Sequence, residues 1–273
     1  MKARQLIEQW PVDSAAAAWF GPGGSDQFGE LDLPYALASV TKPLFAYAVL
    51  IAVEEGTLSL EDACGPEGST VRHVLAHASG LGEDRAAPAA EVGSRRIYSN
   101  LGFGLLAETL ASAAGMSASD YFHLAVVEPL GLTGTRLAGS AAHGAVSTAD
   151  DLRLVLAEWL APTLVHPATM TEAATPQFPD LAGVLPGWGR HDPNPWGLGF
   201  ELRREKSPHW TGSTNSVATY GHFGRAGTFV WADPAARSAC VALTDREFGP
   251  WAKEVWPPFC DAVLDDIATK PGV

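Results

Sequence analysis

The chain has few cysteines, few basic residues and no long apolar run. Its 273 residues include only Cys64, Cys240 and Cys260, which are widely spaced and form no C-x-x-C pair. That odd number and spacing argue against a disulfide framework and against a thiolate metal site, so we expect ordinary buried thiols. A chain of this length buries a sufficient core without such cross-links.

Positive charge is scarce as well, because 18 Lys and Arg stand against 31 Asp and Glu, for a net charge of −13. Binding to a phosphate backbone needs a surplus of basic residues, so we expect no nucleic-acid partner. The first twenty residues interrupt their apolar run with Glu8, Pro11 and Asp13. We therefore expect no secretory signal, no membrane association and, if the chain is the full gene product, a cytoplasmic location.

The pattern of apolar and turn-forming residues changes along the chain. Residues 38–55 are apolar on nearly every face and are followed by Gly56, which predicts a helix buried on all sides. Residues 58–172 show helical periodicity between Gly- and Pro-containing turns. Residues 176–196 are rich in Pro, Gly and Trp, which predicts an irregular surface loop.

Three runs of β character follow this loop: WGLGFELR, GTFVWADP and SACVALTDR. The last two have the form of an antiparallel hairpin with Asp233 and Pro234 at the turn. A closing helix is predicted near residues 252–268. We expect the sheet to be built from both ends of the chain, with these runs supplying its carboxyl-terminal part.

Ser39-Val40-Thr41-Lys42 is an S-x-x-K element at the start of the predicted buried helix. Residues i and i+3 share one helix face, so the Lys42 amine can approach the Ser39 hydroxyl. A partly desolvated lysine has a lowered pKa and can activate a serine as nucleophile. The alternative is a helix-capping serine followed by a surface lysine, but an almost wholly apolar helix favours a buried partner for the lysine.

Tyr98-Ser99-Asn100 is a Y-x-N element that precedes the helical run GFGLLAETL. A phenol beside a lysine cation is expected to titrate lower than a free tyrosine, which would make Tyr98 a general base. Asn100 is expected to hold Lys42 and to orient the substrate. Alone, the pattern also fits a packed tyrosine and a helix-capping asparagine.

Together these elements resemble the serine β-lactamase-like family, which includes class C β-lactamases, DD-peptidases and related esterases. The resemblance extends over roughly residues 35–245. The matching blocks are ALASVTKPLFAYAVLIAVEEGTLSLED, TVRHVLAHASGL, RIYSNLGFGLLAETL, VVEPLGLTGTRL, AVSTADDLRLVL and PWGLGFEL.

The family's third motif is K-T-G or H-x-G on a strand that lines the cleft, and His222-Phe223-Gly224 matches it here. The resemblance implies that Gly224 lets a substrate approach the strand, and that the N–H groups of Ser39 and Arg225 form the oxyanion hole. A neutral His222 would bind a substrate carboxylate more weakly than a lysine. The rival segment 210–213, Trp-Thr-Gly-Ser, has no preceding lysine and no β-rich run directly after it.

Other residues that could bind a metal, act as a nucleophile or line a pocket are weaker candidates for the site. His73 and His77 have the spacing of two zinc ligands, but no Glu follows His73, and we expect no metal and no cofactor. Ser79-Gly80 lacks the glycine that a nucleophile elbow needs two residues before the serine. Trp188 and Trp196 fit pocket lining and packing equally well.

We therefore expect an α/β protein of the α+β type, with an antiparallel sheet flanked by helices and an inserted all-helical lobe, as in β-lactamases and transpeptidases. The predicted sheet lobe comprises residues 1–57 and 176–273, the helical lobe residues 58–175, and the active site lies between them. The expected function is acyl-enzyme hydrolysis of a small ester or amide, most simply by an esterase. A β-lactamase, a D-alanyl-D-alanine peptidase and an inactive ligand-binding relative are the alternatives.

Overall fold

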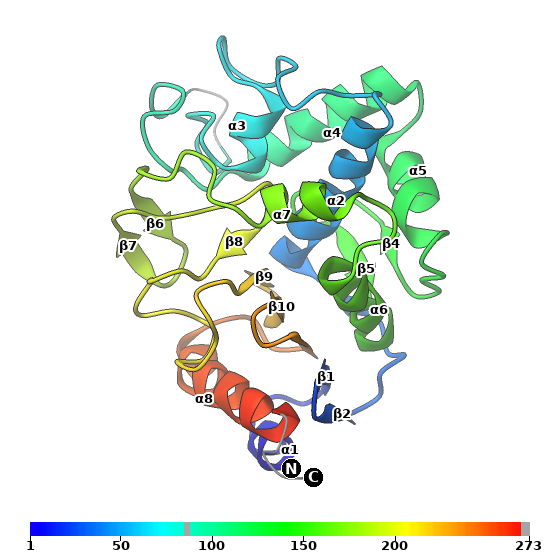
Figure 1. The fold of residues 1–273 in the computed structure, drawn as a ribbon, viewed down its shortest axis with the longest axis vertical. Helices are drawn as coiled ribbons and strands as arrows, with labels where there is room; N and C mark the ends of the chain where they lie inside the picture. Colours follow the sequence, from blue (N-terminus) through cyan, green and yellow to red (C-terminus); the bar gives the residue numbers. More distant parts are fainter. Residues whose placement is uncertain (85–87, 269–273) are drawn as a thin grey trace.

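A six-stranded antiparallel sheet forms the centre of the computed structural model, which describes residues 1–84 and 88–268 (Figure 1). Its strand order is β2-β1-β11-β10-β9-β8. β1 pairs with β11, with Ala15 opposite Thr244, so segments near the two ends of the chain build one sheet. The strands are β1 (Ala15–Gly21), β2 (Gly24–Phe28), β8 (Glu201–Leu202), β9 (Tyr220–Gly224), β10 (Thr228–Asp233) and β11 (Ser238–Thr244).

Both faces of this sheet are covered by helices. Successive side chains of a strand point to opposite faces, so Val230 and Val241 enter the core that contains α2, whereas Trp231 and Cys240 enter the core that contains α8. α1 and α8 lie together at one end of the molecule, and α3 and α4 lie near the other (Figure 1). The helices are α1 (Lys2–Ile7), α2 (Thr41–Glu54), α3 (Val71–Leu75), α4 (Asn100–Ala114), α5 (Ala118–Phe122), α6 (Ala149–Leu160), α7 (Pro167–Ala173) and α8 (Pro250–Ile267), with the short turns η1 (Ala38–Val40) and η2 (His123–Val127).

The predicted fold class is confirmed: an antiparallel sheet is flanked by helices. The hairpin of β10 and β11 also forms as expected, with Asp233 opposite Ser238 at its closed end. The helix predicted for residues 38–55 is one 3₁₀ turn followed by α2, and every residue from Thr41 to Ala52 is buried. The nucleophile helix is therefore the buried centre of the molecule.

Two segments contain strands that the sequence did not predict. Residues 58–175 contain two short strands, β4 (Arg136–Leu137) and β5 (Ala145–Ser147), which join β3 (Tyr35–Ala36) in a second sheet. The loop predicted for 176–196 carries a hairpin of β6 (Gly183–Leu185) and β7 (Gly189–His191). The periodicity of a short sequence window does not reveal strands that pair with distant segments or that contain few β-branched residues, and these strands were therefore not predicted.

The run WGLGFELR forms a strand only at β8. A Cβ at Gly197 would lie 1.9 Å from the Ala173 carbonyl oxygen, and one at Gly199 would lie 2.1 Å from the Ala46 side chain. The backbone of this run therefore packs directly on α7 and α2, and within the run only Glu201 and Leu202 pair with β9 as a strand. The lobe boundaries expected from the sequence remain a prediction, and the segments 85–87 and 269–273 lie outside the described residues.

None of the described helices is by itself long and apolar enough to cross a membrane. The segments Asn100–Ala114 and Ala118–Val127 meet the length and composition requirement only as a pair, and they are bent by 83° at their junction.

The edge strand β8 is anchored by a buried carboxylate. Glu201 is fully buried, and its Oε2 accepts hydrogen bonds from His209 Nε2 at 2.9 Å and Trp210 Nε1 at 2.8 Å. Its Oε1 pairs with the buried ammonium of Lys206, which also donates to the Pro195 carbonyl oxygen. Burial raises the pKa of Glu201, but the charges of Lys206 and His209 outweigh it and hold the pKa well below its usual range. This network holds the segment beside β9 in place.

We expect Glu201→Gln to lower the free energy of unfolding by about 3–5 kcal/mol, because the Lys206 charge is then left buried without its partner. The measurement is urea denaturation at neutral pH. Asp150→Asn is the matched control, since its ion pair with Arg153 is exposed and should cost less than about 1 kcal/mol. Equal losses in the two variants would contradict an anchoring role for Glu201.

Candidate active site

Ser39 lies in the 3₁₀ turn between β3 and α2. The preceding Ala38 has a φ of 45°, a value that residues with a side chain rarely adopt, so the turn must be held by its surroundings. One restraint is visible: the Thr228 hydroxyl of β10 donates to the Leu37 carbonyl oxygen at 2.8 Å. The sheet therefore fixes the position of the nucleophile turn.

Gly224 packs closely against the turn that carries Ser39. A Cβ at this position would lie 2.3 Å from the Leu37 carbonyl oxygen and 2.5 Å from the Thr228 hydroxyl. The missing side chain thus lets the end of β9 pack against the turn that carries Ser39, and the expected approach of a substrate at Gly224 remains a prediction. The adjacent Arg225 N–H remains the predicted partner of the Ser39 N–H in an oxyanion hole.

The Lys42 ammonium is completely buried at the foot of this turn. Its Nζ donates to Asn100 Oδ1 at 2.7 Å, to the Ala142 carbonyl oxygen at 2.8 Å and to Ser39 Oγ at 3.4 Å. Nζ also lies 4.5 Å from the centroid of the Tyr98 ring. The side chains of the S-x-x-K and Y-x-N elements therefore meet at one point.

Burial lowers the pKa of Lys42 to about 7, although the negative charges of Glu83 and Asp84 partly oppose this shift. At neutral pH the amine is present in both protonation states. The neutral form has a lone pair that can accept the Ser39 proton, which makes Lys42 a competent general base.

Tyr98 titrates in the opposite direction from the one expected. Burial raises the pKa of its phenol, and the nearby Ser39 hydroxyl lowers it only in part. The two oxygens do not meet hydrogen-bond geometry, and the Tyr98 hydroxyl has no partner among the described residues. Removal of water from the phenolate outweighs the opposing effect of the Ser39 hydroxyl, so the resting Tyr98 is a protonated phenol.

Asn100 is the first residue of α4, and Ser99 caps this helix by accepting a hydrogen bond from the Gly102 N–H at 3.0 Å. The Asn100 side chain accepts from Lys42, as the sequence suggested, and its Nδ2 donates to Asp84 Oδ1 at 3.1 Å. Both ends of the amide are thus engaged by the protein, so it orients the lysine.

His222 of β9 is buried with 3% of its surface exposed. Its Nδ1 lies 2.6 Å from the Phe223 carbonyl oxygen, so Nδ1 carries the proton and Nε2 is left without a partner among the described residues. Burial, reinforced by the Lys42 charge, lowers the pKa of His222 to about 3. The imidazole is therefore neutral at physiological pH.

The rival third motif lies elsewhere. A Cβ on Gly212 would lie 2.3 Å from the Asp261 carboxylate of α8, and Trp210 donates its indole N–H to Glu201. This segment belongs to the packing between β8 and α8. Of the two candidates only His222 borders a cavity at Ser39.

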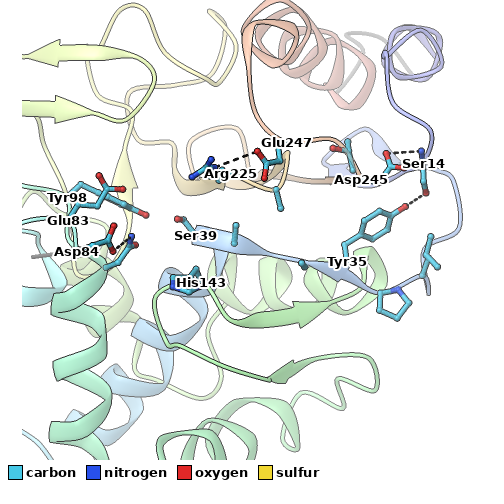
Figure 2. A pocket seen from close by; sticks show the side chains of 17 residues that line it. Ser14, Tyr35, Ser39, Glu83, Asp84, Tyr98, His143, Arg225, Asp245 and Glu247 are labelled. Atoms are coloured by element: carbon cyan, nitrogen blue, oxygen red, sulfur yellow. Dashed lines mark hydrogen bonds and ion pairs between the residues drawn. The ribbon is translucent and has the colours of Figure 1, made fainter.

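Arg225 turns its guanidinium toward the rim of the site (Figure 2). Its side chain is 83% exposed, and its Nε lies 3.7 Å from Glu247 Oε2. The sequence left open whether this cation replaces the missing lysine charge. In the structure it lies beside a carboxylate, which offsets its charge.

Two adjoining cavities open at Ser39. The larger is an open cleft of about 760 Å³, and the smaller is a compartment of about 230 Å³ on the side of His222. Ser39, Glu83, Tyr98 and Arg225 border both cavities. The nucleophile therefore stands where two differently shaped binding spaces join.

The open cleft is rich in carboxylates that the sequence reasoning missed (Figure 2). Glu83 and Asp84 lie at one end, whereas Asp245 and Glu247 lie along the wall formed by the segment after β11. A signal was present, because Asp245 lies near the end of the predicted run SACVALTDR and functional side chains often occupy loops at strand ends. Spacing along the chain gave no indication that these segments converge.

The histidines and tryptophans that the sequence analysis treated as weaker candidates contact other parts of the protein. His73 accepts from the Thr70 N–H in a capping box, and His77 accepts from the Ser99 N–H at 3.2 Å behind the Tyr98 ring. No group of three or more His, Cys, Asp and Glu side chains within residues 1–84 and 88–268 has a metal-binding arrangement. Trp196 borders the small compartment, whereas Trp188 packs on Phe248.

Comparison with known proteins gives a consistent pattern. The family model described as Beta-lactamase matches residues 15–259. A β-lactamase of Mycobacterium bovis, Mb2281c, has a crystal structure similar to this chain at a TM-score of 0.95, with 49% identity over 97% of this chain and 99% of that one. EstCE1, described as a hydrolase with promiscuous acyltransferase activity, is similar at a TM-score of 0.76 with 18% identity over 96% of both chains, which shows the fold alone.

Among curated proteins, penicillin-binding protein 4* of Bacillus subtilis (strain 168) is 29% identical over 136 residues. The match covers 38% of this chain and 30% of that relative, so it spans less than a third of the relative's length.

We expect the rate at which an uncharged fluorophosphonate labels Ser39 to rise with pH through about 7 and then level, because labelling needs neutral Lys42. Glu83→Gln removes a charge that raises the lysine pKa, so its rising limb should move to lower pH. Glu247→Gln is the matched control and should leave the limb in place. Identical profiles for Glu83→Gln and the parent would argue against Lys42 as the titrating base.

Proposed function

Because the chain belongs to the beta-lactamase family, a family of hydrolases that share this fold, we propose that it is an esterase that hydrolyses small uncharged esters through an acyl-enzyme on Ser39. One observation carries the chemistry. The Lys42 amine, whose pKa burial lowers to about 7, is held 3.4 Å from Ser39 Oγ by Asn100 and the Ala142 carbonyl.

In the proposed acylation, neutral Lys42 takes the Ser39 proton as Oγ attacks the ester carbonyl carbon. The negative charge that develops on the carbonyl oxygen is held by the backbone N–H groups of Ser39 and Arg225. Preorganised donors of this kind supply a large share of catalysis in acyl transfer. The tetrahedral intermediate then collapses with loss of the alcohol.

Tyr98 supplies the second proton transfer. Its protonated phenol gives a proton to the departing alkoxide, and the resulting phenolate is stabilised by the Lys42 ammonium 4.5 Å from its ring. The phenolate next removes a proton from the water that attacks the acyl group. Lys42 returns its proton to Ser39 as the acid leaves, so every group ends as it began.

The charges around the cleft favour an uncharged substrate. Glu83, Asp84, Asp245 and Glu247 present negative potential to an incoming ligand, and His222 supplies no opposing cation because it is neutral. A penicillin or a peptide C-terminus carries a carboxylate that these groups repel. A neutral ester meets no such penalty.

A β-lactamase is the second candidate, and the observation that favours it is the 49% identity with the protein described as a β-lactamase of Mycobacterium bovis. A non-catalytic binding protein is the third. The convergence of Ser39, Lys42, Tyr98 and Asn100 speaks against it, because a mere binding site has no need for a buried lysine with a lowered pKa.

We expect Ser39→Ala to reduce ester hydrolysis by ~10⁶-fold while the protein stays folded, since no other atom then carries the acyl group. Mass spectrometry after fluorophosphonate treatment locates the labelled peptide in the parent protein. The buried Ser79 serves as the internal control. A label on Ser79 or Ser213, or residual turnover in Ser39→Ala, would refute the assignment.

We expect a higher kcat/KM for p-nitrophenyl butyrate than for nitrocefin, because the cleft carboxylates repel the nitrocefin carboxylate. Glu247→Gln frees the Arg225 guanidinium, so it should raise nitrocefin turnover relative to butyrate turnover. Steady-state kinetics of both substrates on both proteins provide the test. Faster nitrocefin hydrolysis by the unmodified protein would favour the β-lactamase reading.

A further inference from the structure

The smaller cavity beside Ser39 differs in character from the open cleft. Its walls come from four separate segments, which contribute Leu185 and Pro186 at the tip of the β6–β7 hairpin, Trp196, Phe223 of β9, and Phe248 after β11. The charged residues that border it, Glu83 and Arg225, also border the cleft and therefore stand at the shared mouth. The interior beyond them is apolar, with neutral His222 on one side.

The compartment is preformed by packing. The Phe248 N–H donates to the Arg225 carbonyl oxygen at 2.8 Å, and the Phe248 ring lies 5.2 Å from the Phe223 ring and 5.3 Å from the Trp256 ring. Gly187 has a φ of +77°, and a Cβ there would lie 2.6 Å from the Phe248 ring, so the hairpin tip rests directly on this aromatic group. A wall of this kind is poorly hydrated and binds an apolar group without rearrangement.

We propose that this compartment binds the acyl chain of the substrate and that the open cleft holds the alcohol; the inference rests on the proposed esterase function. The acyl group stays attached to Ser39 through both chemical steps, whereas the alcohol must leave after the first. The smaller cavity of about 230 Å³, with its apolar and aromatic walls, suits the retained group, and the larger cleft of about 760 Å³ gives the departing one a path to solvent. The substrate class is therefore an ester of a short or medium, uncharged, apolar acid.

The test is kcat/KM for p-nitrophenyl acetate, butyrate, hexanoate and octanoate. Leu185→Trp fills the compartment and should lower the hexanoate-to-acetate ratio by on the order of tenfold. Phe248→Leu enlarges it and should raise the octanoate-to-butyrate ratio by a similar factor. The second change is conservative and keeps the experiment informative if Leu185→Trp does not fold, which fluorophosphonate labelling of Ser39 reports.

Leu33→Trp is the matched control, because Leu33 lines only the open cleft of the two. It should leave the acyl-chain profile unchanged and alter instead the relative rates of methyl, butyl and benzyl butyrate. If Leu33→Trp shifts the acyl profile, or if Phe248→Leu leaves it unchanged, the assignment of the two cavities is wrong while the esterase function stands. If the unmodified protein hydrolyses none of these esters, the proposed function fails and the assignment fails with it.

Discussion

The burial of one ammonium group beside Ser39 is the constraint on which the site depends. Lys42 is wholly enclosed, and taking a charge out of water is costly unless polar groups replace the lost hydration. Asn100 and the Ala142 carbonyl do so incompletely, and burial therefore lowers the lysine pKa to about 7. A lysine with a pKa of about 7 is partly neutral at physiological pH, and its neutral form can act as a base. The same side chain on a surface helix would be a permanent cation.

The sheet supports this arrangement from the other side. Thr228 holds the Leu37 carbonyl, and Gly224 has no side chain, so β9 and β10 press directly on the turn that carries Ser39. The positive φ of Ala38 is maintained by these contacts. The nucleophile is thus placed by a junction of helix and sheet, which gives it a more exact position than a free loop would.

Charge and shape divide the substrate space around this junction. The open cleft has carboxylates at its rim, and its neighbouring arginine lies beside one of them, Glu247. The smaller compartment is apolar and walled by aromatic rings. An ester with an apolar acid portion and an uncharged alcohol is complementary to both spaces, whereas a carboxylate-bearing substrate is opposed by the first.

The sequence by itself determined the fold class, the buried nucleophile helix, the β10–β11 hairpin and the elements built on Ser39, Lys42, Tyr98 and His222. The apolar run and the short spacing of Ser39 and Lys42 encode the helix and its S-x-x-K element, because those residues are neighbours along the chain. The fold class and the third-motif position of His222 follow from the resemblance to a known family. Only the tertiary structure decided that Tyr98 rests protonated, that Gly224 packs on the Ser39 turn, and that Arg225 lies beside Glu247. It alone also showed that Leu185, Trp196 and Phe248 line one cavity. A pKa depends on how much water distant segments remove, and a cavity exists only where such segments meet. Neither quantity is a property of local sequence.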